Sequence, residues 1–353
     1  MKITKVAAFM LAMGLMGGLF ASGKKDGQKE VQLGTLSYLN FSEEQTGRMY
    51  DSAYLAYKQL EEKGYLKVAQ KDKVKISPSV KFYDTLDSLL MALKSGEIWG
   101  IAGLPQSTAS YLCAKDNTLG MNMAFDIPKQ TAERRSFAYR AYKIMNDAFS
   151  FMMLEKNSDL CAQFNKVIEE MNQDGSMKKL ISEQILDAMD GRELQVIQPE
   201  NKAGRATIKV AVTGALPPMD YVAADGTFAG FNTALLAEIG KRLDKNITMV
   251  QVSSVGRATA LASGTVDVVF WTRSASLPPS LAKMTAAEFK TFRNEVMAKD
   301  TPEEKAALDA LISSYAEKDG DPRSIRAHKD TPAGTITTVS YFEDMPVIVG
   351  LKN

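Results

Sequence analysis

Residues 208–273 read IKVAVTGALPPMDYVAADGTFAGFNTALLAEIGKRLDKNITMVQVSSVGRATALASGTVDVVFWTR. A β-branched run at the start and two later apolar runs predict three strands, over 208–212, 247–252 and 266–271. Between them, an apolar stripe that begins after Asn232 or Thr233 and a shorter run near 258–261 predict two helices. Strands and helices that alternate in this way predict a parallel sheet covered by helices, which is an α/β fold.

The same stretch carries short motifs in a fixed order. They are Pro217-Pro218, Tyr221, Asp225-Gly226, Gly230-Phe231, Ala260-Leu261, Ser263-Gly264, Val266 and Asp267. In this order they resemble the first lobe of the bacterial extracytoplasmic solute-binding proteins of the amino-acid type, family 3. The resemblance implies a periplasmic-binding-protein-like type II fold, in which two α/β lobes enclose a cleft.

Length and charge fit that fold class. A chain of 353 residues can bury two cores of ordinary size. Its 43 basic and 42 acidic residues nearly cancel, so nothing in the charge favours a nucleic-acid partner.

The N-terminus has the pattern of an export signal. Lys2 and Lys5 precede an apolar run over 6–20, and Ala21-Ser22-Gly23 has the small residues of a cleavage site. We expect a signal peptide over 1–23 and a flexible tether over 24–30, which places the mature protein outside the cytoplasm, in the periplasm or secreted. The alternative is an uncleaved membrane anchor. No other segment approaches the length of a membrane span.

Residues 31–189 are predicted to form another α/β unit of short strands and helices. It ends in a helix whose pattern resembles the end of the family's second lobe, on Leu160, Asn165, Val167, Ile168, Glu170, Met171, Asp174 and Gly175. We therefore expect a lobe over 31–189 that resembles the family's second lobe, a linker or hinge over 190–206, and a lobe over 207–353 that resembles its first.

One hypothesis is a single receptor whose lobes are swapped in chain order. It predicts that Val31 and Asn353 lie near each other at the hinge. The alternative is two tandem single-lobe modules. The last lobe also carries a predicted helical insertion over 277–320, with capping boxes at Thr285–Glu288 and Thr301–Glu304.

The chain shows little sign of catalysis, so we do not expect an enzyme. His328 is the only histidine and lies in a polar stretch without a nucleophile motif. Clusters of metal ligands and motifs for a cofactor are not evident, and we expect neither a metal nor a cofactor. Cys113 and Cys161 either pair in an oxidising compartment or stay buried as free thiols.

The predicted ligand site lies at the carboxyl ends of the strands, where parallel sheets bind ligands. Arg273 is the first candidate, because a guanidinium can hold a carboxylate through two parallel hydrogen bonds. The other candidates supply aromatic faces, hydroxyls, carboxylates or an amide: Thr272, Trp271, Tyr221, Asp220, Ser253, Tyr38, Asn40, Asp84 and Thr108.

Two departures from the family limit what the resemblance implies about the ligand. The family's carboxylate-binding arginine lies in a T-x-x-R motif, whereas Arg273 follows Asp267 too closely to match it. The family aspartate that holds an α-amino group aligns with Leu104. We therefore expect a small polar ligand, an amino acid or a related carboxylate, and a peptide fragment or another polar metabolite stays open as an alternative.

By resemblance, the chain captures this ligand between its lobes and delivers it to the permease of an ABC transporter. The alternative is a ligand-sensing module that acts through a membrane or protein partner. An enzyme with the same fold is a third hypothesis, because one fold can serve many functions.

Overall fold

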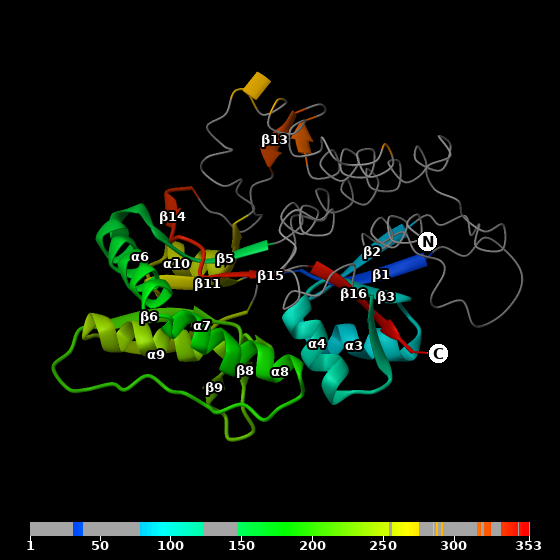
Figure 1. Ribbon diagram of the computed structural model, residues 1–353, viewed down its shortest axis with the longest axis horizontal. Coiled ribbons are helices and arrows are strands. Elements are labelled where there is room, and N and C mark those ends of the chain that lie inside the picture. The colour runs from blue at the N-terminus through cyan, green and yellow to red at the C-terminus, as the bar shows by residue number, and fades with distance from the viewer. Residues whose placement is uncertain are drawn as a thin grey trace, which may run out of the picture.

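The computed structural model describes residues 31–37, 78–122, 147–253, 256–274, 333–344 and 346–352, with short stretches between 285 and 325. The expected leader and tether and most of the expected insertion lie outside these residues. The described part forms two mixed sheets, A and B, which lie beside each other with helices packed on them (Figure 1).

Sheet A has five strands in the order β2-β1-β3-β16-β4. They are β1 (Val31–Leu36), β2 (Pro78–Tyr83), β3 (Gly100–Pro105), β4 (Leu119–Asn122) and β16 (Pro346–Leu351). The first three run parallel, and β16 runs antiparallel between β3 and β4. Helices α3 (Leu86–Ser95) and α4 (Gln106–Lys115) pack on this sheet.

Sheet B has the order β10-β6-β11-β5-β14, and β15 also pairs with β5. Its strands are β5 (Asp147–Leu154), β6 (Thr207–Val212), β10 (Asn246–Gln251), β11 (Val268–Ser274), β14 (Thr335–Thr337) and β15 (Phe342–Asp344). The parallel strands β10, β6 and β11 are those predicted from the opening stretch, and β5 runs antiparallel to β11.

Helices cover both faces of sheet B because its strands are apolar on both sides. Met152, Ala211 and Val269 form one buried cluster with α10 (Arg257–Ala262). Their neighbours Phe151 and Val268 face the larger core, together with α6 (Ser158–Gln173) and α9 (Phe231–Leu243). This core continues without interruption into sheet A.

Smaller elements complete the described part. After α6 come α7 (Ser176–Ile181), the π-helical turn η4 (Ser182–Leu186) and α8 (Asp187–Met189). The strands β7 (Ala215–Leu216), β8 (Asp220–Val222) and β9 (Phe228–Ala229) form a small sheet. The β8–β9 hairpin has Asp225-Gly226 at its tip. The short strands β12 (Ala316–Lys318) and β13 (Asp321–Ile325) pair with each other.

Local signals explain where the helices begin and end. The Thr85 hydroxyl accepts a hydrogen bond from Ser88 N (3.2 Å) and caps α3, and Gly96 ends it with a φ of 76° that favours glycine. At residue 285, Thr285 N donates to Glu288 Oε2 (2.7 Å) and Glu288 N donates to Thr285 Oγ1 (3.3 Å). The capping box predicted there is confirmed, whereas the box predicted at Thr301–Glu304 lies outside the described residues.

The two sheets exchange strands, which the predicted boundaries did not foresee. β5, expected in the first unit, pairs with β11 of sheet B, and β16, expected in the second, pairs with β3 and β4 of sheet A. A division at 190–206 therefore does not separate the sheets. The apolar pattern identifies a strand but carries no information about its partner.

The predicted fold class, an α/β chain of the periplasmic-binding-protein-like type II with two α/β lobes, is confirmed by these two sheets. Within the described residues, no helix has the length and apolar character required to cross a membrane.

Candidate functional site

The carboxyl edges of the two sheets meet where the chain crosses between them. Arg273 at the end of β11 pairs with Phe149 near the start of β5, and Pro346 at the start of β16 pairs with Pro105 at the end of β3. Figure 1 shows β15 between the two lobes, directly before β16. The predicted strand ends therefore lie at the junction of the lobes, which is where ligands bind in open α/β sheets.

On sheet A, two of the predicted strand ends come together. The Ser37 hydroxyl, after β1, donates a hydrogen bond to Asp84 Oδ1 (3.1 Å), after β2. Asp84 is exposed and has room for further partners. Thr108 lies in the first turn of α4, is fully buried, and its hydroxyl has no hydrogen-bond partner among the described residues.

The first turn of α4 is tied to the crossover by a contact that the sequence did not reveal. Asp344 Oδ2, at the end of β15, accepts hydrogen bonds from Ser107 Oγ (2.6 Å) and Ser107 N (3.2 Å). Asp344 is only 1% exposed. A carboxylate at a helix N-terminus is stabilised by the free N–H groups and the helix dipole, so this contact fixes α4 against the crossover.

On sheet B, the structure corrects the prediction for Asp220. This carboxylate is fully buried, and its Oδ2 accepts hydrogen bonds from Thr213 N (3.1 Å), Thr213 Oγ1 (3.0 Å) and Gly214 N (2.9 Å). It therefore fastens the turn after β6 to β8, and no part of the carboxylate is open to solvent. A single carboxylate beside a turn looks the same in sequence whether it binds a ligand or holds the turn.

Tyr221, the next residue, lies in β8 of the small sheet and is half-buried. Burial raises the pKa of its phenol, and the charge of Tyr111 of α4 adds to the increase. Ser253, after β10, is exposed, and its carbonyl accepts a hydrogen bond from Gly256 N (3.0 Å) at the start of α10.

The remaining candidates are described only in part. Trp271, Thr272 and Arg273 belong to β11, with Thr272 opposite Ser150, but their side chains lie outside the described part of the molecule. Tyr38 and Asn40 lie outside it altogether.

Groups suited to metal or redox chemistry are few in the described ranges. Three or more histidine, cysteine, aspartate or glutamate side chains do not gather there in a way that could hold a metal ion. Cys113 and Cys161 carry free thiols, and burial raises the pKa of both.

A separate network of charges joins α6, α7 and α9 in the lobe that carries sheet B. Arg242 of α9 contacts Asp174 Oδ2 (2.8 Å), Glu238 Oε1 (2.8 Å) and Ser176 Oγ (2.9 Å). Hydrogen bonds from Ser176 and then Arg242 lower the pKa of Asp174 to about 2. Burial acts to lower the pKa of Arg242, but the carboxylates of Glu238 and Asp174 outweigh it and raise the pKa.

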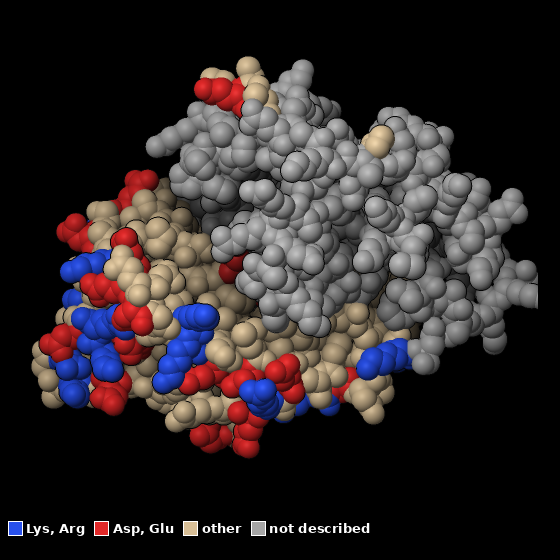
Figure 2. Space-filling view, viewed as in Figure 1, with Lys and Arg blue, Asp and Glu red and all other residues tan. Residues whose placement is uncertain are grey.

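Outside this network, the visible surface of the lobe carries basic and acidic side chains interspersed with each other (Figure 2). This agrees with the balanced charge of the whole sequence.

Comparison with known proteins identifies one part of the chain. Residues 208–276 match the family model of the bacterial extracellular solute-binding proteins, family 3. The resemblance drawn from the motifs of the opening stretch is thereby confirmed over that stretch. No curated protein sequence matches the chain.

Solved structures align with most of the chain at low similarity. One is the probable amino-acid ABC transporter extracellular-binding protein of Bacillus subtilis, with 9% identity, 93% of this chain and 86% of that chain covered, and a TM-score of 0.37. A putative L-cystine ABC transporter from Listeria monocytogenes has 11% identity, with 92% of this chain and 84% of that chain covered and a TM-score of 0.35. The GluR0 ligand-binding core from Nostoc punctiforme, in complex with L-glutamate, has 8% identity, with 92% of this chain and 85% of that chain covered and a TM-score of 0.32.

Proposed function

We propose that this chain, whose residues 208–276 match the family 3 solute-binding proteins, is an extracytoplasmic solute-binding protein of an ABC transporter. It captures a small polar ligand, an amino acid or a related carboxylate, between its two lobes and delivers it to the transporter permease. The lobes close over the ligand by a hinge motion at the crossovers.

One observation carries this proposal. The stretch that matches the family supplies the three parallel strands β6, β10 and β11, and their carboxyl ends lie at the junction of the two lobes. The part of the chain with family identity thus contributes one wall of the place where this class of fold binds its ligand.

Arg273 is the residue that would bind the ligand carboxylate, since its backbone lies at the carboxyl end of β11 beside the crossover. Thr272, Trp271, Tyr221 and Ser253 would line the same wall. Tyr38, Asn40, Asp84 and Thr108 would line the opposite one, and Asp220 is left out because its bonds hold the turn.

Leu104 argues for a carboxylate over a complete α-amino acid. It aligns with the family aspartate that binds an amino group, and here it is a fully buried apolar side chain of β3. A ligand amino group would therefore need another partner, and Asp84 is the exposed carboxylate among the predicted residues.

We also propose that the lobes are swapped in chain order. The segment with the family's usual ending, β5 and α6, packs in the same lobe as the family-matching stretch. Val31 and Leu351 lie at the same end of sheet A with β3 between them, as expected where a chain has been cut. This end is opposite Pro346, where β16 enters the sheet, so the expectation that the cut lies at the hinge is wrong.

The test begins with native mass spectrometry of the purified protein, to identify a ligand that remains bound. Calorimetry with that ligand then compares the wild type with Arg273→Ala and with Arg192→Ala. Arg192 is a matched control because it pairs with Asp187 (2.6 Å) and Asp190 (3.5 Å) away from the strand ends. Loss of one charge-assisted bidentate pair should weaken binding about 10-fold or more.

Equal affinity of Arg273→Ala and wild type would remove Arg273 from the site. If neither the mass spectrum nor a panel of amino acids and carboxylates gives a ligand, the proposed function itself fails.

A further inference from the structure

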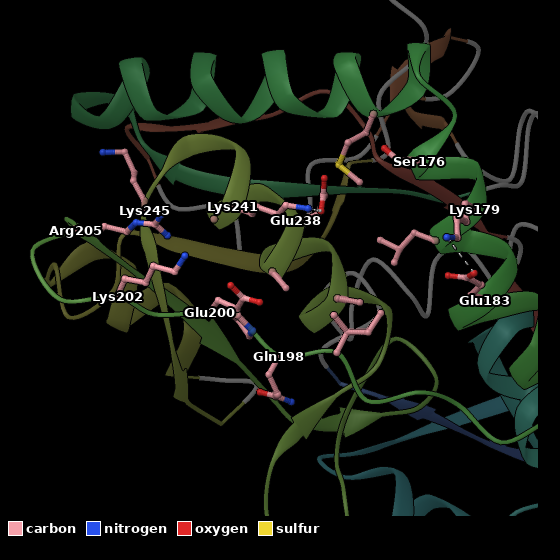
Figure 3. Close-up of a pocket in the computed structure, with 17 residues that line it drawn as sticks. Ser176, Lys179, Glu183, Gln198, Glu200, Lys202, Arg205, Glu238, Lys241 and Lys245 are labelled. Carbon is pink, nitrogen blue, oxygen red and sulfur yellow. Dashed lines mark ion pairs between the residues drawn. The ribbon is translucent and has the colours of Figure 1, made fainter.

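The lobe that carries sheet B contains a cavity on the side of the amino ends of β6 and β10, away from the carboxyl ends where the ligand site is predicted. Its volume is about 480 Å³, and it lies between α7, α9 and the connector that leads from α8 to β6 (Figure 3). Cavities of this size, roughly 300–1,000 Å³, are typical of sites for small molecules.

The connector is held over the cavity by hydrogen bonds. Asn201 donates to the Ile247 carbonyl (2.9 Å) and accepts from Ile247 N (2.9 Å), and Lys202 N donates to Asn246 Oδ1 (2.8 Å). Below the connector, α9 presents the small side chains Ala234 and Ala237, which leave the space unfilled. The connector and α9 therefore form two opposite walls of the cavity, and hydrogen bonds hold the connector in place.

Charged groups lie around an apolar middle. Met171, Leu180, Ile197 and Pro199 line the cavity with the two alanines, together with five basic and three acidic side chains: Lys179, Lys202, Arg205, Lys241, Lys245, Glu183, Glu200 and Glu238. Figure 3 shows Lys202, Arg205 and Lys245 at one end, and Lys179 with Glu183 at the other.

Most of the acidic groups are already neutralised. Glu238 pairs with Arg242 (2.8 Å) and Lys241 (3.8 Å), and Glu183 pairs with Lys179 (3.8 Å). In the basic end, Arg205 pairs with Asp244 (2.5 Å), whose side chain is 75% exposed. Lys202 and Lys245 form no ion pair with any other described residue. Within the described part of the chain, the positive charge of these two lysines thus has no acidic partner.

We propose that this cavity is a second ligand site, separate from the strand ends, for a small organic anion with an apolar body. The carboxylate or phosphate group of the anion lies at the basic end, between Lys202, Arg205 and Lys245. Guanidinium and ammonium groups both donate charge-assisted hydrogen bonds to such oxyanions. The apolar body lies over Ala234 and Ala237.

Glu200 allows a test in which two substitutions should change the binding affinity in opposite directions. It is the one acidic group of the cavity lining for which the described residues provide no ion pair. Its charge opposes an anion in the cavity, whereas the charges of Lys202 and Arg205 attract one. Removing Glu200 should therefore strengthen binding, and removing the basic pair should weaken it.

The experiment titrates the full chain with four probes by calorimetry. Phenyl phosphate and benzoate carry an apolar body and an oxyanion, inorganic phosphate carries the oxyanion alone, and benzyl alcohol carries the body alone. We expect saturable binding of phenyl phosphate or benzoate, whichever oxyanion fits, and weaker binding of the other two. Absence of saturable binding of both organic anions at millimolar concentration overturns the proposal.

Substitutions of cavity residues test whether the probes bind in this cavity. Lys202→Gln with Arg205→Gln should weaken it about 10-fold or more. Ala237→Phe should abolish it by filling the cavity without a change of charge, and Glu200→Gln should strengthen it. Lys178→Gln, on an exposed position of α7 outside the cavity, is the matched control and should leave it unchanged.

Equal effects of Lys178→Gln and the basic double variant would overturn the proposal, as would unchanged binding in a folded Ala237→Phe protein. Should Ala237→Phe fail to fold, the affinities of Glu200→Gln and of the double variant still test the proposal, because they should change in opposite directions. Arg273→Ala should leave this binding intact, so failure here and failure of the proposed transport function are distinguished.

Discussion

Replacing Asp220 by alanine tests whether this carboxylate holds the turn after β6. The change leaves Thr213 N, Thr213 Oγ1 and Gly214 N without the acceptor that now lies at 3.1, 3.0 and 2.9 Å. Each buried donor without a partner costs about 1–3 kcal/mol. Asp220 is 0% exposed, so water cannot replace the lost acceptor without rearrangement. The lower part of the sum over three donors gives an expected loss of about 3–5 kcal/mol.

Urea unfolding followed by circular dichroism measures this loss, and a thermal scan should show a midpoint lower by roughly 10 °C. Asp225→Ala is the matched control. Asp225 lies at the tip of the same hairpin and also accepts from a threonine, Thr227 N (3.0 Å) and Thr227 Oγ1 (2.7 Å), but it is exposed. Its replacement should leave the midpoint near that of the wild type. An Asp220→Ala protein as stable as Asp225→Ala would refute the structural role.

Three further predictions follow from single contacts. Asp174 has a folded pKa of about 2, below its ordinary 3.8, so its contribution to stability is present above pH 3.8 and is lost as the pH falls to about 2. Asp174→Asn should therefore lose less stability than the wild type over that range, and parallel melting curves would contradict this. Cys113 and Cys161 should react slowly with a thiol reagent at pH 8 in the folded protein, with half-buried Cys113 first, and both should react after unfolding in urea without reductant. Fewer than two reactive thiols in urea would indicate a disulfide. Gly230→Ala should destabilise far more than Gly226→Ala in a thermal scan. Both have a positive φ, but a Cβ at Gly230 would meet backbone oxygens, Met219 O at 2.8 Å, whereas at Gly226 it would meet nothing within 4 Å. Equal midpoints would contradict it.

The elements of the opening stretch were predictable because their signals are local. The strand predicted over 208–212 is β6 (Thr207–Val212), and the helix predicted after Asn232 or Thr233 is α9 (Phe231–Leu243). Each rests on a repeat of apolar side chains with a turn or cap nearby, and such patterns lie within one element. The part of the family resemblance that the family model confirms lies in the same compact stretch.

Relations between distant segments were not predictable in the same way. Ser107 and Asp344 are 237 positions apart, and no feature of either neighbourhood signals that they bond. The partners of β5 and β16 escaped prediction for the same reason. At the candidate site, the strand ends could be named from the sequence, but the burial of Asp220 and Thr108 depends on packing by the rest of the chain.

The exchange of β5 and β16 between the sheets also bears on how the chain folds. β5 is made early but pairs with β11 far downstream, and β16, the last strand described, fills the space between β3 and β4. Contacts between such distant residues give a high contact order, and chains of high contact order fold slowly. Sheet A remains split into two parts, each with an unpaired edge, until residues 346–351 have been synthesised. A chain shortened by these residues should expose both edges to pairing with other molecules.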